Sequence, residues 1–310
     1  MKILSPLVIS AALFATAMIP SLNATTLDLS EAKGFNLLTW GNATQPNSDI
    51  EGRAAIGGNA SFSNFSIGNS IVSANLSDAA LIVGGNLTVS NGSVKNGSVY
   101  VGGNEFGSMT TTAGTVTSTN LGAAVPFNFA TAKSALSTKS ATYGAALATG
   151  TSLLQYSTLT LTGSNADLNI FNISGTDLDA ASTLSLNVTA GSHVLINVSG
   201  TSVNFDNAGL SGFTSDLTLF NFYQATSLTF SSVSMVGSIL ASSANVTYNN
   251  GNVNGELIAN SFTGGGELHN SIFKNQKPPT NVPDTTSTAL LGLFGLIGCG
   301  LFRRLSSNRR

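Results

Sequence analysis

The sequence predicts an all-β protein that folds as an irregular, right-handed parallel β-solenoid with one flanking α-helix. The first observation behind this prediction is a repeated triplet that follows short apolar stretches. It occurs at Gly57-Gly58-Asn59, Gly84-Gly85-Asn86 and Gly102-Gly103-Asn104. Self-similar segments about 18 to 27 residues apart are typical of solenoid coils, which bury their inward side chains on the coils above and below.

The second observation is a set of echoes in the other half of the chain. Residues 171–176 (Phe-Asn-Ile-Ser-Gly-Thr) resemble residues 196–201, and residues 237–241 resemble residues 255–259. Asparagines between apolar neighbours are expected to stack as hydrogen-bonding ladders along the solenoid axis. A β-sandwich also has short strands separated by turns and is the competing fold, but it does not require such echoes.

The N-terminal segment has the features of a secretory signal peptide. Lys2 precedes an apolar segment over residues 3–19, and small residues follow. We assign residues 1–24 to the signal peptide, with cleavage near Ala24 or, as the alternative, Ala17. An uncleaved membrane anchor is the other reading, and both imply export. Residues 25–273 then form the solenoid domain.

One segment departs from the strand pattern and predicts a helix over about residues 127–148. Apolar residues recur near every 3.5 positions, Asn128 is a candidate N-cap and Gly150 a candidate stop. The apolar stripe consists of Phe129, Ala132, Leu136, Tyr143 and Leu147. Ser140 interrupts this stripe, so we expect modest packing against a flank of the solenoid. No glycine-rich phosphate loop opens the helix, which argues against a coenzyme-binding role.

The C-terminal residues form a tail with three parts. Residues 274–281, with Pro278-Pro279, predict a short stiff linker. Residues 282–304 contain a polar motif, an apolar run and two arginines, and residues 305–310 a cytoplasmic tail. The apolar run is shorter than the roughly 20 residues of an ordinary spanning helix, so we expect a marginal transmembrane segment.

The motif residues of this tail are Val282, Pro283, Asp284 and Ser287, and Arg303 and Arg304 close the apolar run. The tail resembles the bacterial PEP-CTERM class of sorting signals, in its Val-Pro-Asp-Ser-Gly variant. That resemblance implies recognition by an exosortase, a membrane-embedded cysteine protease or transpeptidase. Thr285-Thr286 replace the small residues usual in the variant, which leaves the subtype and the cleavage point open.

A second resemblance covers roughly residues 34–270. Residues 50–59 (Ile-Glu-Gly-Arg-Ala-Ala-Ile-Gly-Gly-Asn) and the closing residues 220–222, 237–241, 254–259 and 266–269 are similar to the choice-of-anchor A family. Ala241-Ser242 departs from the Ala-Pro expected there. The resemblance implies an extracellular domain joined to a surface-attachment tail and brings no catalytic residues. The closing motif also resembles solenoids of the ice-binding type, which carry a flanking helix.

Composition excludes several classes of function. The 310 residues carry 12 Lys+Arg and 14 Asp+Glu, a net charge of −2, so there is no basic field for nucleic acid. The single cysteine, Cys299, lies in the apolar tail. The folded part therefore has no disulfide, no cysteine metal site and no cysteine nucleophile. We expect no cofactor.

The acidic residues are few and lie outside known motifs. Asp49, Glu51 and Arg53 occupy alternate positions and are expected to face one side, either as a cation or ligand site or, more simply, as a surface ion pair. Aspartates in turn-like contexts serve the backbone there; they are Asp167, Asp177 and Asp179. No calcium-loop pattern is present, and we predict no metal site.

The two histidines, His193 and His269, stand in no catalytic motif. Glu256 and Glu267 with His269 form a late acidic–histidine group, which we interpret as turn chemistry. We therefore predict no catalytic residues and a protein that is not an enzyme. Catalysis by Glu256 or His269 on a carbohydrate is the alternative to test.

Threonine residues recur in two segments of the chain. Thr158, Thr160 and Thr162 share one face of an alternating strand, and residues 110–119 are rich in threonine. Such an array could order water as ice binders do, or could simply be a solvated sheet face. Asn-x-Ser/Thr sequons, such as those at Asn42, Asn75 and Asn187, are interpreted as the composition of a β-face.

Together these features predict an exported bacterial surface or extracellular-matrix protein that is not an enzyme and takes part in adhesion or an exopolysaccharide biofilm matrix. Its expected partners are an exosortase-like enzyme, the membrane before processing, and a surface polymer such as exopolysaccharide. The expected path leads transiently through the inner membrane to the cell surface or matrix. An ice-binding or carbohydrate-active solenoid is the alternative function, and a self-assembling coat component is a further one.

Overall fold

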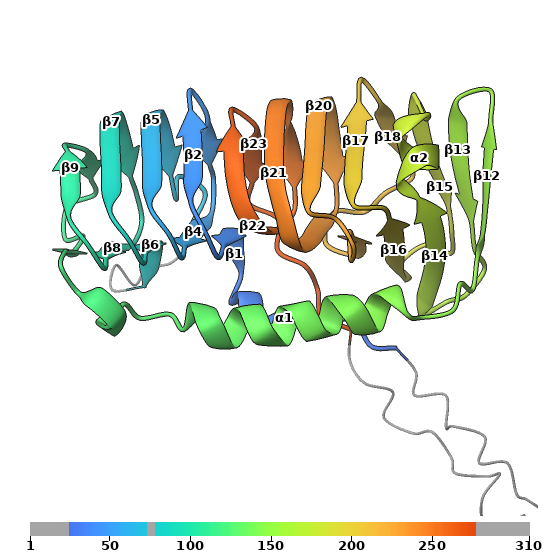
Figure 1. Ribbon diagram of the computed structural model, residues 1–310, viewed down its shortest axis with the longest axis horizontal. Coiled ribbons are helices and arrows are strands. Elements are labelled where there is room, and N and C mark those ends of the chain that lie inside the picture. Colours follow the sequence, from blue (N-terminus) through green and yellow to red (C-terminus); the bar gives the residue numbers. More distant parts are fainter. Residues whose placement is uncertain (1–24, 73–77, 277–310) are drawn as a thin grey trace, which may run out of the picture.

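The protein is a parallel β-solenoid flanked along its length by helix α1 (Phe129–Gly144), as the computed structural model shows (Figure 1). The predicted fold class is confirmed. The structure describes residues 25–72 and 78–276. The predicted signal peptide, the sorting motif and the apolar tail lie outside these residues. Within the described ranges, no helix combines the length and apolar character needed to cross a bilayer.

The strand pairings define three sides of the solenoid. The first, the helix side, lies against α1 and pairs its strands in one continuous ladder. In spatial order its strands are β11 (Thr117–Ser118), β8 (Ser98–Val101), β6 (Ala79–Val83), β4 (Arg53–Ile56), β1 (Phe35–Thr39), β22 (Leu257–Gly264), β21 (Ser238–Asn254), β19 (Thr218–Asn221), β16 (His193–Ser199) and β14 (Leu168–Ser174).

The second side, which we call the hydroxyl face, carries the surface discussed below. Its strands in spatial order are β9 (Glu105–Gly107), β7 (Leu87–Val94), β5 (Ala60–Ile67), β2 (Ala43–Pro46), β22, β21, β20 (Ser227–Val236) and β17 (Ser202–Asp206). The longer strands bend at a corner and therefore also pair on a neighbouring side.

The third side contains β10 (Thr110–Thr111), β3 (Asp49–Ile50), β23 (Glu267–His269) and the later parts of β5, β7, β20 and β21. A separate four-stranded sheet lies at one end of the molecule (Figure 1). Its strands are β12 (Thr151–Gln155), β13 (Thr158–Thr162), β15 (Thr183–Asn187) and β18 (Gly209–Ser211). Short helices complete the fold: η1 (Ser30–Ala32), η2 (Gly122–Ala124) and α2 (Gly175–Asp179).

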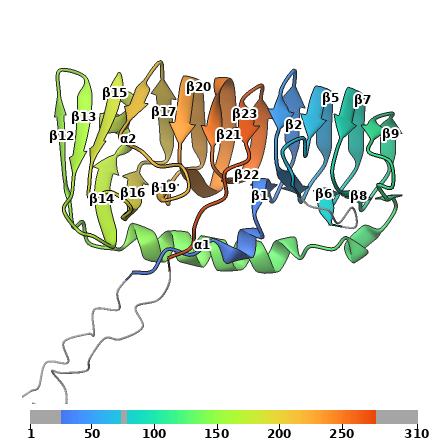
Figure 2. The same ribbon diagram turned by 180° about the vertical axis from the view of Figure 1, so that it is seen from behind.

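The path of the chain places its two halves side by side in the middle of the molecule. The chain begins centrally at β1 and winds outward to β9, and α1 then returns along the length of the solenoid to β12 (Figures 1 and 2). From there the coils wind back until β22 and β23 pair with β1, β2 and β3. Leu37, for example, lies opposite Leu257. We call this junction the seam.

The interior is filled by inward side chains that stack from coil to coil. Phe205, Phe230 and Tyr248 lie in one such row and are fully buried. The rings of Phe230 and Tyr248 stack with centroids 5.0 Å apart. Full burial of a side chain of this size contributes about 1.5–3 kcal/mol. The solenoid is thus stabilised by repeated apolar layers and needs no cross-link.

Helix α1 begins as predicted, because the Asn128 side chain accepts a hydrogen bond from the Thr131 amide at 3.0 Å. It ends at Gly144, several residues before the predicted boundary at 148. The helix buries Ala132, Leu136, Ser140 and Tyr143. Leu147 lies beyond the helix and is 76% exposed, so its assignment to the apolar stripe was wrong. Ser140, in contrast, belongs to the contact face.

The predicted asparagine ladder is confirmed on the helix side. Asn172, Asn197 and Asn221 lie in register on adjacent strands. Asn197 Nδ2 donates to Asn172 Oδ1 at 2.9 Å, and Asn221 Nδ2 donates to Asn197 Oδ1 at 2.8 Å. The same amides also donate to carbonyl oxygens at the C-terminal end of α1 and just beyond it. The ladder therefore fastens the helix to three successive coils.

The segments at the two ends of the described chain lie together beside α1. Lys139 of the helix forms ion pairs with Asp28, at 2.6 Å, and with Glu31. Gln276 exchanges hydrogen bonds with Leu27, because the Gln276 amide donates to the Leu27 carbonyl at 2.7 Å and the Leu27 amide to Gln276 Oε1 at 3.3 Å. Residues 274–276, the start of the predicted linker, thus contact the body.

Candidate functional site

A row of hydroxyl side chains crosses the hydroxyl face from one coil to the next. The strand registers place these residues directly beside one another, from β7 through the seam to β20. In spatial order they are Thr88, Ser61, Thr44, Thr263, Thr247 and Thr229. Neighbouring strands lie about 4.8 Å apart, so the row presents hydroxyl groups at a regular spacing.

The row exists because polar and apolar residues alternate along each contributing strand. In β2, for example, Ala43 and Gln45 point into the core while Thr44 is exposed. Ser61, Thr88 and Thr263 are likewise exposed, and Thr229 and Thr247 are half-buried. Flanking outward positions add further serine and asparagine. Because alternate residues of a strand face opposite sides, the inward residues pack in the core and the outward residues form the surface.

The hydroxyl face is nearly free of charge. Among its outward strand positions in the described residues, Asp206 on the outermost strand β17 is the one ionisable side chain. Phe106, 51% exposed on β9, stands in register with Thr88 at the opposite end. A surface of this kind offers hydrogen bonds of both donor and acceptor type without attracting ions.

Asparagine ladders hold the corners of this face. Asn47, Asn64 and Asn91 have positive φ angles of 55°, 48° and 52°, which asparagine adopts more readily than most residues. Asn64 Nδ2 donates to Asn47 Oδ1, and Asn91 Nδ2 donates to Asn64 Oδ1, each at 2.6 Å. The corner turns are therefore locked to one another, which favours a rigid and flat surface.

A second ladder arises from the repeated triplets. The amides of Asn59, Asn86 and Asn104 each donate to the Oδ1 atom of the asparagine one coil away, at 2.8 to 2.9 Å. The first acceptor is Asn42. The sequence signal that predicted coils thus also marks the second corner of the hydroxyl face.

The threonine array predicted at Thr158, Thr160 and Thr162 lies elsewhere, on β13 at the end of the molecule. Its alternation is confirmed, because Leu159 and Leu161 between the threonines are buried. The array continues into β15 and the short strand β18 on one side, and on the other side Thr162 lies opposite Thr151 of the antiparallel strand β12. Residues 110–119 lie at the opposite end, around β10 and β11. The longer row was missed, since its members are scattered along the sequence as single hydroxyl residues.

The predicted group of Asp49, Glu51 and Arg53 is divided by a corner. Asp49 lies on β3, whereas Arg53 begins β4 on the helix side, so the expectation that all three face one side was wrong. Arg53 instead forms an ion pair with Asp78 at 3.5 Å. Glu51 lies at the corner beside β23, near Glu267 and His269.

The late acidic group is also divided. Glu256 is 1% exposed on the helix side, where its carboxylate accepts a hydrogen bond from the Phe273 amide at 3.2 Å. Burial raises the pKa of Glu256 to about 8, although that hydrogen bond opposes the shift. Glu267 and His269 lie on β23, a strand and not a turn, and form a contact of 3.3 Å.

The remaining candidate residues make contacts within the fold or lie outside the described ranges. His193 Nε2 lies 2.7 Å from the Lys274 carbonyl oxygen. Asp177 and Asp179 lie within α2, and the side chain of its N-cap residue Ser174 accepts a hydrogen bond from the Asp177 amide. The Asp167 carbonyl accepts from the His193 amide. Sequon residue Asn42 belongs to a corner ladder and Asn187 ends β15. Asn75 and the sorting residues Val282, Pro283, Asp284, Ser287, Arg303 and Arg304 lie outside the described ranges.

Comparison with known families places the chain among ice-binding-like adhesive domains. The model of the family described as "Putative Ice-binding-like adhesive domain" matches residues 28–270, and the chain belongs to this family. The chain is also similar to the crystal structure of an ice-binding protein from an Antarctic ascomycete, Antarctomyces psychrotrophicus, with a TM-score of 0.36 and 15% identity over 82% of this chain and 100% of that chain. No curated protein matches the chain.

Proposed function

We propose that the chain is an exported adhesive protein of the bacterial surface or matrix, that it is not an enzyme, and that it binds exopolysaccharide through the hydroxyl face. The observation that carries this proposal is the hydroxyl row from Thr88 to Thr229, which is regular, exposed or half-buried at each position, and set in a face that is nearly free of charge. Sugar hydroxyl groups both donate and accept hydrogen bonds, as serine and threonine do.

The repetition of the face suits a repetitive ligand. A single hydroxyl contact contributes little, because it replaces a contact with water. A polymer that meets the same group on successive coils gains from many such contacts at once, since each bound unit holds the next one close. Membership of an adhesive family supports this reading of the surface.

The sequence tail supplies the route to the surface. Its resemblance to PEP-CTERM signals supports processing by an exosortase-type enzyme after transient residence in the inner membrane. The resemblance of the body to the choice-of-anchor A family supports display on the cell surface or in the matrix. In this proposal the tail determines location, and the hydroxyl face determines what is bound there.

Sedimentation of the full-length chain with purified exopolysaccharide from the producing organism tests the proposal. We expect the protein to pellet with the polymer at low and at high salt, because the face carries almost no charge. Absence of co-sedimentation, or binding abolished by moderate salt, would contradict it. Bovine serum albumin and an unrelated neutral polymer serve as controls.

Ice binding is the second candidate, favoured by the threonine content of the same row: Thr44, Thr88, Thr229, Thr247 and Thr263. Regularly spaced threonines on a rigid face can order water. If ice is the ligand, the purified chain should slow the growth of single ice crystals and show no affinity for exopolysaccharide. Polymer binding without any effect on ice favours the first candidate.

A further inference from the structure

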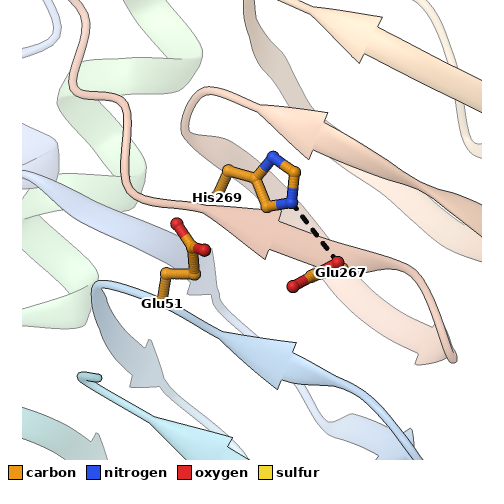
Figure 3. Close-up of side chains that lie close together, drawn as sticks. All are labelled: Glu51, Glu267 and His269. Carbon is orange, nitrogen blue, oxygen red and sulfur yellow. Dashed lines mark ion pairs between the residues drawn. The ribbon is translucent and has the colours of Figure 1, made fainter. Parts of the chain in front are cut away.

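Three side chains that could hold a metal ion meet at the seam, on the third side of the solenoid. Glu51 follows β3 of the N-terminal half, and Glu267 and His269 lie on β23 of the C-terminal half (Figure 3). One ligand atom of each lies within 4.8 Å of the others, and all three residues are half-buried. Leu268, which points inward between the two ligands of β23, lies in register with Ile50.

The hydrogen bonds around His269 determine which ring nitrogen carries the proton. Asn254 Nδ2 donates to the Asn252 side chain at 3.2 Å and lies 3.4 Å from the Met235 carbonyl, so Asn254 Oδ1 is left as the acceptor. That oxygen lies 2.6 Å from His269 Nδ1, which must therefore be the N–H donor. In the neutral ring, Nε2 then carries a lone pair.

This lone pair faces another acceptor. His269 Nε2 lies 3.3 Å from Glu267 Oε2 (Figure 3), and two acceptors at that distance repel each other unless a positive charge lies between them. Glu51 adds a second carboxylate. Among the described residues, neither glutamate forms an ion pair with a lysine or an arginine; Arg53, Lys139 and Lys274 pair with other carboxylates. A cation or a proton between His269 Nε2 and Glu267 Oε2 removes this repulsion, whereas one oxygen of Glu51 already accepts a hydrogen bond from the Asn270 amide at 3.0 Å.

We propose that Glu51, Glu267 and His269 bind a divalent transition-metal ion of the Zn²⁺ type. One imidazole nitrogen and two carboxylates form a ligand set suited to such ions, with water completing the coordination. Asn254 acts as the positioning residue, because a hydrogen bond to the other ring nitrogen fixes the orientation of a metal-binding histidine. This inference is independent of the polymer-binding proposal.

The location gives the metal a structural consequence. The ligands come from positions 51, 267 and 269, so a bound ion links the first and last coils that meet at the seam. A ligand that binds only the folded state stabilises it by an amount that grows with the logarithm of the ligand concentration once that concentration exceeds the Kd. The metal is therefore expected to raise the melting temperature of the protein and to couple the unfolding of the two halves of the solenoid.

Isothermal titration of ZnCl₂ into the full-length chain tests the site, in a Cys299→Ser background that removes the single thiol. We expect one saturable site and a rise in melting temperature with Zn²⁺. Glu51→Gln and His269→Gln should each weaken binding about tenfold or more. Glu105→Gln, which changes a carboxylate on the distant strand β9, should leave the affinity unchanged. Melting temperatures without metal confirm that each variant folds.

The alternative, a proton between His269 and Glu267, gives a different pattern. If that is the whole explanation, the unvaried chain shows no saturable Zn²⁺ binding, and ¹⁵N spectra of His269 report a doubly protonated ring at neutral pH. Equal affinity in the unvaried chain, in Glu51→Gln and in His269→Gln would also overturn the proposal. Loss of affinity in both variants, with Glu105→Gln unaffected, supports it.

Discussion

Ser140 of helix α1 and Asn221 of strand β19 form a reciprocal pair. Ser140 Oγ donates to Asn221 Oδ1 at 2.6 Å, and Asn221 Nδ2 donates to the Ser140 carbonyl at 2.9 Å. Both residues are buried, so each polar group depends on the other for its hydrogen bond. The serine that interrupts the apolar stripe of the helix is thus the point at which the helix is fastened to the solenoid.

Asn221→Ala should lower the free energy of unfolding by about 1–3 kcal/mol. The substitution removes the hydrogen bonds that Asn221 makes with the Ser140 hydroxyl, with the Ser140 carbonyl oxygen and with Asn197 Oδ1, all of which are buried. Urea denaturation followed by circular dichroism measures this change. Asn204→Ala, at an exposed position of β17, is the matched control and should change stability by no more than about 0.5 kcal/mol. Equal effects of the two substitutions would argue against the ladder as the attachment of α1.

Gly84→Ala should destabilise the protein by about 1–3 kcal/mol through overpacking. A Cβ atom at this position would lie 2.4 Å from the carbonyl oxygen of Gly57, and backbone atoms of the adjacent coil cannot easily move aside. Thermal unfolding measures the loss.

Gly209→Ala is the control for this substitution. No heavy atom lies within 4 Å of a Cβ placed at Gly209. Because alanine restricts the unfolded chain, this change should be neutral or should stabilise the protein by less than about 1 kcal/mol. If both variants unfold at the same temperature, the triplet glycines are not required by coil contact.

The repeated segments predicted the coils, because residues that stack on one another in adjacent coils must match in size and polarity. That match appears in the sequence as a repeat. Phe171 and Ile196, which occupy equivalent places in the two echoes, lie directly opposite each other in β14 and β16. The helix N-cap at Asn128 was equally local and equally predictable. In each case the residues that make the contact belong to the pattern that revealed it.

The seam could not be predicted in this way. No repeat indicates that α1 carries the chain back across the molecule, so the contact between the first and last coils appears only in three dimensions. The hydroxyl row is continuous only because Thr44 meets Thr263 there, and the proposed metal site exists only because Glu51 meets His269. Residues so far apart in sequence share no local signal.

Glu256 should make stability depend on pH. Its folded-state pKa of about 8 lies above the ordinary value of 4.5, so between these values the unfolded chain is ionised while the folded protein keeps the proton. The free energy of unfolding therefore falls as the pH rises from about 4.5 to about 8, by up to about 1.4 kcal/mol per pH unit from this group.

Glu256→Gln should remove this contribution, since glutamine cannot ionise and can still accept the hydrogen bond from Phe273. Compared with the unvaried protein, the variant should be more stable at pH 8 and similar at pH 4. Urea titrations at both values provide the measurement. A variant that loses stability at pH 8 would mean that the carboxylate is needed in its charged form.

If the tail is the sorting signal that we propose, deletion of Val282, Pro283 and Asp284 should hold the protein at the inner membrane, because the proposed sorting enzyme then lacks its recognition motif. Fractionation of cells and mass spectrometry of the mature C-terminus follow the outcome. Replacement of Ser306 and Ser307, which lie beyond the arginines, is the control and should leave processing intact. Normal surface display of the deletion variant would refute the assignment of the tail.

The most direct measurement of the central claim compares polymer binding by variants of two threonine surfaces. Thr44→Tyr and Thr263→Tyr place bulky side chains side by side in the middle of the hydroxyl face, whereas Thr162→Tyr makes the same change on β13. Co-sedimentation with exopolysaccharide should fall at least about tenfold for the first pair combined and remain unchanged for Thr162→Tyr. Undiminished binding by the double variant, or equal loss in Thr162→Tyr, would contradict the assignment of the hydroxyl face as the adhesive surface.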